Sequence, residues 1–341
     1  MTRVAGTDPG TSSLDILILE DGTVRDQCRF TPQELRADPA LPVRWLEQRG
    51  PFDLIAGPSG YGLPLVRAAD CTERDLALMS LVRPDDRGRG QGVLGFSAVV
   101  RALCASALPV VFLPGVIHLP TVPVHRKINR IDLGTPDKLC VAALALASEA
   151  GAGDLAVVEL GTAFTACLVL QGGRVVDGVG GTSGPVGWGS GGAWDGEAAY
   201  LLSPLVKSDL FAGGVRSVAD AAAARACFRE SLLKAVAGLQ AVTPFDRLVL
   251  SGRLLEVEPA LAAAVAADLG RFGSVAVLAP LPGAWVKHAA QGAALLADGL
   301  AGGRHAPLVE RLRLRAAAGT VLDWLCHPRA AEMRAAPDVT R

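Results

Sequence analysis

The chain has 341 residues, of which 50% are hydrophobic and 20% are charged, and its formal net charge is −1. This length and composition allow a sizeable core and two domains of ordinary size, and they exclude a wholly disordered chain. The balanced charge, without a dense run of lysine and arginine, argues against a nucleic-acid partner and a membrane-surface partner.

The cysteines and the apolar stretches indicate a cytoplasmic protein. The seven cysteines are scattered and form no Cys-x-x-Cys pair, which is typical of thiols in a reducing compartment and not of disulfides or a zinc site. A strand is expected directly after Met1, so we expect no signal peptide. The longest uncharged stretch, residues 102–124, contains four prolines and is not expected to form a membrane helix.

The first predicted element is a strand pair at the N-terminus. Residues 3–7 and the apolar run at 14–19 flank a polar bend, a pattern that indicates strand, tight turn and strand. A phosphate chain and its Mg²⁺ need backbone N–H groups, hydroxyls and carboxylates at close range, and this bend supplies all three. The residues that do so are Asp8, Gly10, Thr11, Ser12 and Ser13.

The segment up to residue 92 contains a helix, a strand and two polar turns. Residues 31–48 are expected to form the helix. The strand at 52–57 opens into a Gly/Pro turn, whose Ser59 and Tyr61 either touch a ligand or belong to a plain connection. The glycine-rich run at 83–92 is either a mobile surface loop or, through its three arginines, a lid over an anionic substrate.

The densest polar cluster before the middle of the chain lies at residues 120–139. Four basic residues within six positions favour an anion site over a solvated surface. These residues are His125, Arg126, Lys127 and Arg130. Thr135 and Pro136 predict a helix start, which places Asp137 and Lys138 in the first turn. Asp137 is either a functional carboxylate or a residue that complements the helix dipole.

The central stretch, residues 157–170, repeats the N-terminal pattern. An apolar run leads to Glu159, Gly161 and Thr162 and is followed by another apolar run, as in a hairpin with a ligand site in its bend. A single Gly-Thr turn between strands is common. Two such acidic bends in one chain are more specific, and they favour a pair of phosphate-binding hairpins.

The rest of the chain contains a glycine-rich segment, several helices and a further ligand turn. The many glycines of residues 178–197 predict either a loop whose backbone approaches something closely or a flexible surface loop. Helices are expected at 201–210 and 218–239. A strand ending at residue 250 leads into the turn Ser251-Gly252-Arg253, and the small residues at 287–303 suit a closely packed helix.

In this order of hairpin, helices, hairpin and Ser-Gly turn, the chain resembles the acetate/sugar kinase, heat-shock chaperone and actin (ASKHA) superfamily. The resemblance spans residues 4–303. It implies an α/β fold of two actin/ribonuclease-H-like domains with a nucleotide cleft between them, and it implies ATP and Mg²⁺ as cofactors. The implied domains are residues 1–150 and 151–303, followed by a helical tail at 304–341.

The resemblance also implies roles for individual residues. Asp8 matches the acid that organises Mg²⁺, and Glu159 stands where the second motif usually has Asp, so both are implied as metal-site residues. Ser251 and Gly252 match the adenosine turn, in which Arg253 occupies a position that is often glycine. The residues implied in nucleotide binding are Gly10, Thr11, Ser12, Ser13, Gly161, Thr162, Ser251, Gly252 and Arg253.

Two further resemblances concern the substrate. Residues 134–139 look like a motif of type III pantothenate kinases, in which an aspartate acts on the substrate hydroxyl, and this implies Asp137 as a base. The chain as a whole is similar to an uncharacterised family labelled predicted butyrate kinase, although the Arg/His/Tyr signature of acetate kinases is not evident. We therefore predict an ATP-dependent kinase that acts on a small-molecule substrate, with short-chain carboxylates as one substrate class.

The acceptor group stays open at this point. A hydroxyl would give its proton to Asp137, whereas a carboxylate needs no base and would be oriented by cations. The residues predicted to take part in transfer are Asp137, Asp8, Lys138 and Arg130, with Arg126 and Lys127 as further cations. Two alternatives are an ATPase switch that acts on a partner protein and an ATP-dependent ligase in cofactor synthesis. Either a monomer or a homo-oligomer fits the sequence.

Overall fold

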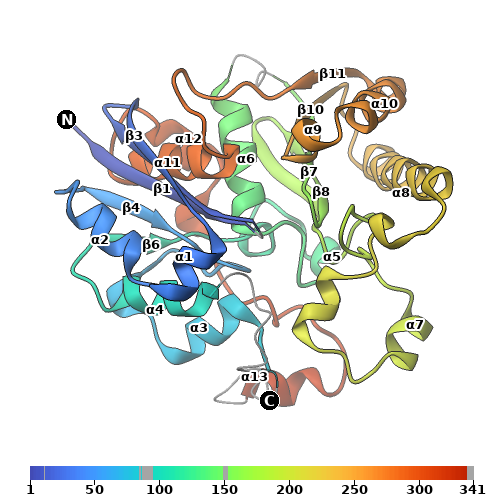
Figure 1. Cartoon of the computed structure of the whole chain (residues 1–341), viewed down its shortest axis with the longest axis horizontal. Coiled ribbons are helices and arrows are strands. Elements are labelled where there is room, and N and C mark those ends of the chain that lie inside the picture. The colour runs from blue at the N-terminus through green and yellow to red at the C-terminus, as the bar shows by residue number, and fades with distance from the viewer. Residues whose placement is uncertain (11, 84–85, 87–94, 149–152, 336–341) are drawn as a thin grey trace.

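The protein contains two β-sheets with helices between and around them (Figure 1). The computed structural model describes residues 1–10, 12–83, 86, 95–148 and 153–335. The predicted α/β class is confirmed. Among the described residues, no helix is both long enough and apolar enough to cross a membrane.

The two sheets share one strand arrangement. Their strand orders are β3-β2-β1-β4-β6-β5 and β9-β8-β7-β10-β11. In each sheet, three consecutive strands pair antiparallel with their neighbours in the chain. The first of these three also pairs in parallel with a fourth strand. The first sheet comprises β1 (Arg3–Pro9), β2 (Leu14–Glu20), β3 (Thr23–Phe30), β4 (Leu54–Gly57), β5 (Val66–Arg67) and β6 (Val110–Phe112). The second comprises β7 (Leu155–Leu160), β8 (Thr165–Gln171), β9 (Arg174–Val179), β10 (Arg247–Ser251) and β11 (Ser274–Val277).

Two helices lie at the centre of the molecule. Helix α6 (Pro136–Ala147) packs against α11 (His288–Leu300), and α11 also packs against β1, β2 and β4 (Figure 1). The second half of the chain thus supplies a helix to the first sheet. A domain boundary near residue 150 separates the strands of the two sheets, but it does not separate the helices that pack against them. The other helices are α1 (Pro32–Ala37), α2 (Leu41–Glu47), α3 (Glu73–Ser80), α4 (Phe96–Cys104), α5 (Val124–Lys127), α7 (Gly196–Leu201), α8 (Ala221–Val242), α9 (Leu254–Val257), α10 (Pro259–Leu269), α12 (Ala306–Arg311) and α13 (Ala330–Ala335).

Strand β7 contributes to two cores. Because successive side chains of a strand point to opposite faces, Leu155 and Val157 enter the central core, which also contains α6 and α11. Ala156 and Val158 enter a second core, which contains residues of α8 and α10. The near-continuous burial of β7 is the result, and it explains why the central stretch of the sequence is apolar at consecutive positions.

The contact between α6 and α11 depends on small residues. A Cβ on Gly292 would lie 1.8 Å from the carbonyl oxygen of Cys140, and a Cβ on Gly6 would lie 2.0 Å from the backbone nitrogen of Ala294. Neither position can carry a side chain without moving the backbone. The predicted close packing of this helix is confirmed.

Two of the predicted elements differ from the structure, and a third lies almost wholly outside the described residues. Residues 31–48 form two helices, because Pro39 disfavours the helical conformation at Asp38 and ends α1 there. The predicted helix at 201–210 is replaced by the end of α7 and a 3-10 helix, Lys207–Phe211. The predicted lid or loop at 83–92 lies outside the described residues, apart from Arg83 and Asp86.

Candidate active site

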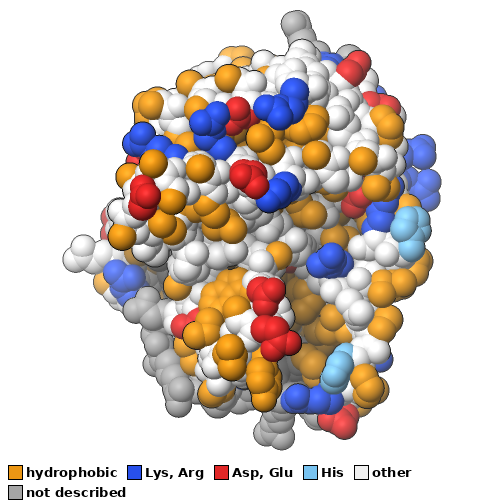
Figure 2. Space-filling view, turned by 90° about the vertical axis from the view of Figure 1, so that its right-hand side faces the viewer, with side chains coloured by type: hydrophobic (Ala, Val, Ile, Leu, Met, Phe, Trp, Pro, Cys, Tyr) orange, Lys and Arg blue, Asp and Glu red, His pale blue; other side chains and the backbone are white. Residues whose placement is uncertain are grey.

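A cavity of about 1190 Å³ lies between the two halves of the molecule. Its walls include the bends of both hairpins, the first turns of α6 and α11, and the turn after β10. Ligand sites in open α/β sheets gather at such strand ends. On the face of the molecule drawn in Figure 2, basic, acidic and hydrophobic side chains are interspersed.

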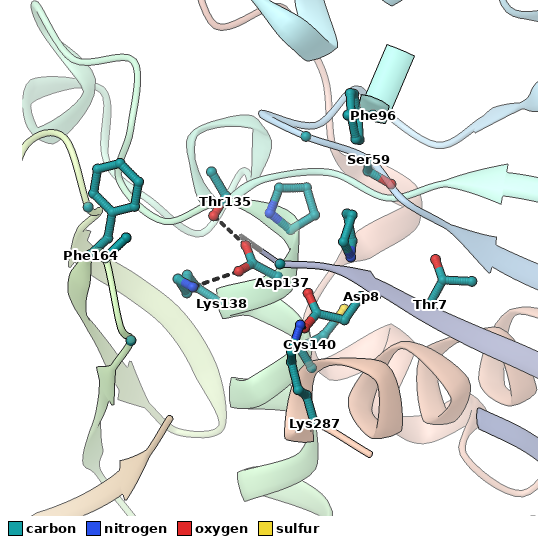
Figure 3. Close-up of a pocket in the computed structure, with 18 of the residues that line it drawn as sticks. Thr7, Asp8, Ser59, Phe96, Thr135, Asp137, Lys138, Cys140, Phe164 and Lys287 are labelled. Carbon is teal, nitrogen blue, oxygen red and sulfur yellow. Dashed lines mark hydrogen bonds and ion pairs between the residues drawn. The ribbon is translucent and has the colours of Figure 1, made fainter. Parts of the chain in front are cut away.

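Asp8 lies near the end of β1, at the entrance to the first bend. Its carboxylate is buried, and Lys287 Nζ lies 3.3 Å from its Oδ2 (Figure 3). Asp8 Oδ1 accepts no hydrogen bond from any residue that the structure describes. Burial raises the pKa of Asp8, and the charge of Lys287 opposes this effect only in part. Asp8 therefore has one oxygen available to a cation.

A second carboxylate, Asp15, faces Asp8 in the register of β1 and β2. Arg29 pairs with Asp15 at 2.7 Å, and Lys287 donates its main-chain N–H to Asp15 at 3.0 Å. Burial would raise the pKa of Asp15, but the hydrogen bonds from Arg29 and the charge of Lys287 hold it below its ordinary value. The Ser13 hydroxyl also donates to Asp15, at 2.6 Å, and Ser13 does not line the cavity, so its hydroxyl proton is engaged within the protein.

A second group of charges comes from α6 and β7. Lys138 Nζ lies 2.6 Å from Asp137 Oδ2 and 2.7 Å from Glu159 Oε2. The Thr135 hydroxyl donates a short hydrogen bond to Asp137 (Figure 3). Burial would raise the pKa of Asp137, but Lys138 and Thr135 hold it below its ordinary value. Burial does raise the pKa of Glu159, despite Lys138. Asp137 is thus an ionised carboxylate in the cavity wall.

The turn after β10 lies beside the first bend. Gly252 has a φ of 107°, and a Cβ there would lie 2.3 Å from the carbonyl oxygen of Leu160, so this position needs glycine. Arg253 Nη1 donates to Ser12 Oγ at 3.2 Å. Ser251 Oγ lies 2.9 Å from Nδ1 of His288, the first residue of α11. These contacts join the predicted adenosine turn to the first phosphate bend.

Main-chain hydrogen bonds hold the two bends in shape. Gly10 donates its N–H to the Ser13 carbonyl at 2.9 Å, and Gly161 donates its N–H to the Phe164 carbonyl at 3.0 Å. These two amides are therefore not free to bind a phosphate. Thr11 lies outside the described residues. Of the bend residues predicted to bind nucleotide, Gly10, Ser12, Gly161 and Thr162 line the cavity.

The basic cluster at residues 125–130 does not reach the cavity. Arg126 donates to the carbonyl of Val176 in β9 at 2.8 Å, and Lys127 donates to the carbonyl of Leu119 at 2.8 Å. Arg130 is exposed and does not line the cavity. Contrary to the prediction, neither this cluster nor Arg130 contributes to the cavity wall, because Arg126 binds Val176 and Asp177 of β9 and Lys127 binds the main chain.

The glycine-rich segment approaches groups of the protein itself. A Cβ on Gly180 would lie 1.7 Å from Asp132 Oδ1, and a Cβ on Gly187 would lie 2.3 Å from the carbonyl oxygen of Ala163. Asp132 Oδ2 accepts hydrogen bonds from both the N–H and the hydroxyl of Thr182, each at 3.0 Å. The segment is therefore packed against the second bend, and the interpretation as a free surface loop is wrong.

Several polar residues of the cavity wall were absent from the predicted site. Asp15, which does not line the cavity itself but binds Lys287, was also absent and was detectable, because the hairpin register places it opposite Asp8. Lys287 and His288 were visible only as the start of a helix, and nothing in the sequence connects them to hairpins far earlier in the chain. Lys207 was assigned to a helix that does not form.

The acidic residues fit a Mg²⁺ ion that is bound mainly through phosphates and water. Within the described parts of the chain, no group of three or more His, Cys, Asp or Glu residues could hold a metal by itself. Mg²⁺ usually keeps several waters and takes one or two carboxylates together with substrate phosphates. The unpartnered Oδ1 of Asp8 and the nearby carboxylate of Glu159 match that requirement.

Comparison with known proteins gives a family and a fold. A family model described as "Protein of unknown function (DUF1464)" matches residues 6–327, and a search of curated proteins found no match. An acetate kinase from Entamoeba histolytica is 12% identical at a TM-score of 0.54, over 79% of this chain and 87% of that one. A propionate kinase from Francisella tularensis subsp. tularensis SCHU S4 is 15% identical at a TM-score of 0.54, over 86% and 99%. These likenesses confirm the predicted fold of two actin-like domains.

Proposed function

The chain belongs to the family described as "Protein of unknown function (DUF1464)", and we propose that it is an ATP- and Mg²⁺-dependent phosphotransferase acting on a small metabolite. The observation that carries the proposal is that both acidic hairpin bends and Asp137 line one cavity of about 1190 Å³. The fold that the chain shares with an acetate kinase and a propionate kinase supports it. We further propose the domains 1–150 and 151–303, with the nucleotide between them and a tail at 304–341.

Transfer would rest on positioning and on neutralisation of charge. Asp8 would bind Mg²⁺ through its free Oδ1, and Glu159 would bind it through water. When bound, the metal would neutralise charge on the phosphates. Lys287 would keep Asp8 in place, because Asp15 fixes both the main chain and the ammonium of Lys287. The turn that begins at Ser251 would receive the adenosine.

The site favours a hydroxyl as the acceptor group. Asp137 lines the cavity and is kept ionised, so it can accept the proton of an acceptor hydroxyl as a general base. Three of the four cations expected to orient a reacting carboxylate, Arg126, Lys127 and Arg130, lie elsewhere. A short-chain carboxylate such as butyrate is the second candidate, because the two structures of the same fold are an acetate kinase and a propionate kinase.

A metabolite screen for ADP release with Mg²⁺ and ATP tests the proposal. We expect a small molecule to accelerate ADP release, and Asp137→Asn to lower kcat about 100-fold or more while ATP still binds. Added hydroxylamine distinguishes the acceptor, because it cleaves an acyl phosphate and leaves a phosphate ester intact. Acceleration by a protein and by no metabolite would instead favour the ATPase switch. An unchanged rate in Asp137→Asn would remove the base.

A further inference from the structure

Lys207 brings an ammonium group to the cavity from the second half of the chain. It begins the 3-10 helix Lys207–Phe211 and lines the cavity. Its Nζ lies 3.2 Å from the Tyr61 hydroxyl and 4.5 Å from the centroid of the Tyr61 ring. Its main-chain N–H donates to Asp86 at 2.5 Å. Contacts with the first half of the chain therefore fix Lys207 from two directions.

The ammonium of Lys207 has no ion pair with any residue that the structure describes. The nearest candidates are already engaged, because Asp86 accepts from the Lys207 main chain and Asp132 accepts from Thr182 and Gly134. Burial lowers the pKa of Lys207 to about 8, although Asp132 and Asp86 act against this effect. A partly desolvated ammonium with only a phenol as its partner is unfavourable, and a bound anion would stabilise it.

The anion that suits this position is on the acceptor and not on the nucleotide. Figure 3 shows Phe164 on the other side of Asp137 and Lys138 from Asp8 and Lys287. Phe211, in the same 3-10 helix as Lys207, packs against Phe164 at 5.0 Å between ring centroids. Lys207, which contacts Tyr61 and shares its 3-10 helix with Phe211, thus lies among aromatic residues of the cavity wall, whereas Asp8 lies beyond Asp137 and Lys138 from Phe164. An ammonium beside aromatic rings suits a carboxylate on a small apolar body.

We propose that Lys207 is the specificity-determining residue for the acceptor, that its Nζ pairs with a carboxylate, and that the acceptor is therefore a small hydroxy acid. The proposal rests on the phosphotransferase function above, in which Asp137 takes the proton of the hydroxyl. An ionised Asp137 would repel a reacting carboxylate, whereas a hydroxy acid can present its hydroxyl to Asp137 and its carboxylate to Lys207.

Calorimetric binding to the full chain, loaded with Mg²⁺ and a non-hydrolysable ATP analogue, tests the pairing without turnover. The probes are 2-, 3- and 4-hydroxybutanoate, each compared with its primary amide. Because the three isomers differ in the separation of hydroxyl and carboxylate, their relative affinities report the spacing between the groups that bind these two. We expect at least one acid to bind about 10- to 100-fold more tightly than its amide, as for a charged hydrogen bond. Lys207→Gln should remove this preference, and Lys207→Arg should keep part of it.

Lys234→Gln is the matched control, since Lys234 is an exposed lysine paired with Glu230 on α8. It should leave the preference for acid over amide intact. The proposal is overturned if no acid binds more tightly than its amide, or if Lys207→Gln retains the preference. It is also overturned if butanoate, which lacks the hydroxyl, is converted to a hydroxylamine-sensitive product. Absence of phosphoryl transfer to any tightly bound acid would contradict the proposed function, while the binding result would still decide the role of Lys207.

Discussion

The two hairpins have the same backbone arrangement and neutralise their carboxylates differently. In the first, the register sets Asp8 opposite Asp15, so two carboxylates face each other across neighbouring strands. In the second, Glu159 lies opposite Ala166, and its charged neighbour comes from α6. The duplication therefore extends to the strands and not to the electrostatics.

Each hairpin receives a lysine from one of the two central helices. Lys287 immediately precedes α11 and lies beside Asp8, and Lys138 in the first turn of α6 lies between Glu159 and Asp137. The two helices pack where Gly292 meets Cys140. The position of both lysines thus depends on one helix contact, and this is how the core sets the geometry of the site.

The largest expected effect distinguishes the two hairpin carboxylates. Both carboxylates have a lysine partner, but Lys138 lies 2.7 Å from Glu159 Oε2, whereas Lys287 lies 3.3 Å from Asp8 Oδ2 and leaves Oδ1 unpartnered among the described residues. We expect Asp8→Asn to lower kcat about 1000-fold, comparable to loss of a group that stabilises the transition state. Glu159→Gln should lower it about tenfold and leave the Mg²⁺ requirement nearly unchanged. Initial rates at varied Mg²⁺ measure both. Equal losses in the two variants would contradict the assignment of Asp8 as the direct metal ligand.

The next effect concerns the lysines. Lys138→Met leaves Asp137 and Glu159 facing each other without a cation, and we expect the free energy of unfolding to fall by about 3 kcal/mol. In Lys287→Met, Asp15 keeps Arg29, and Asp8, whose pKa is already raised by burial, can take up a proton, so the expected loss is about 1 kcal/mol. Urea denaturation at pH 7 compares the variants. A larger loss in Lys287→Met would show that the first hairpin depends more on its helix than the second.

A smaller effect tests the contact between the helices. Gly292→Ala places a Cβ against the carbonyl oxygen of Cys140, and we expect it to destabilise the protein by about 2 kcal/mol and to weaken nucleotide binding. Gly238→Ala is the control, because Gly238 is exposed in α8 with no atom near the position of a Cβ. It should stabilise the protein by about 0.5 kcal/mol. Normal nucleotide affinity in Gly292→Ala would show that the lysines do not depend on this contact.

The sequence predicted the features that are local in the chain. Apolar runs on either side of a polar bend predicted both hairpins, and Thr135-Pro136 predicted the start of α6, because neighbouring residues determine these elements. The partners of the carboxylates could be predicted less well. Lys287 and Asp8 meet only because α11 packs on the first sheet. The charges of the basic cluster at 125–130 suggested an anion site, but Arg126 and Lys127 bind carbonyl groups of β9 and of the neighbouring main chain.

The smallest effect separates Asp8 from Asp15 by pH. The pKa of Asp15 is lowered from 3.8, so its ionised form stabilises the fold above that pH, and this contribution is lost as the pH falls through the folded-state pKa. Asp15→Asn should therefore be less stable than the unsubstituted protein at pH 7, by about 1.5 kcal/mol, and the difference should shrink toward pH 3.

The pKa of Asp8 is raised, so its ionised form opposes folding. Asp8→Asn should therefore be more stable than the unsubstituted protein at pH 7, and this gain should also shrink on acidification. Urea midpoints across pH 3 to 7 would show two differences of opposite sign. The same sign in both variants would mean that the two facing carboxylates share one charge and titrate as a single site.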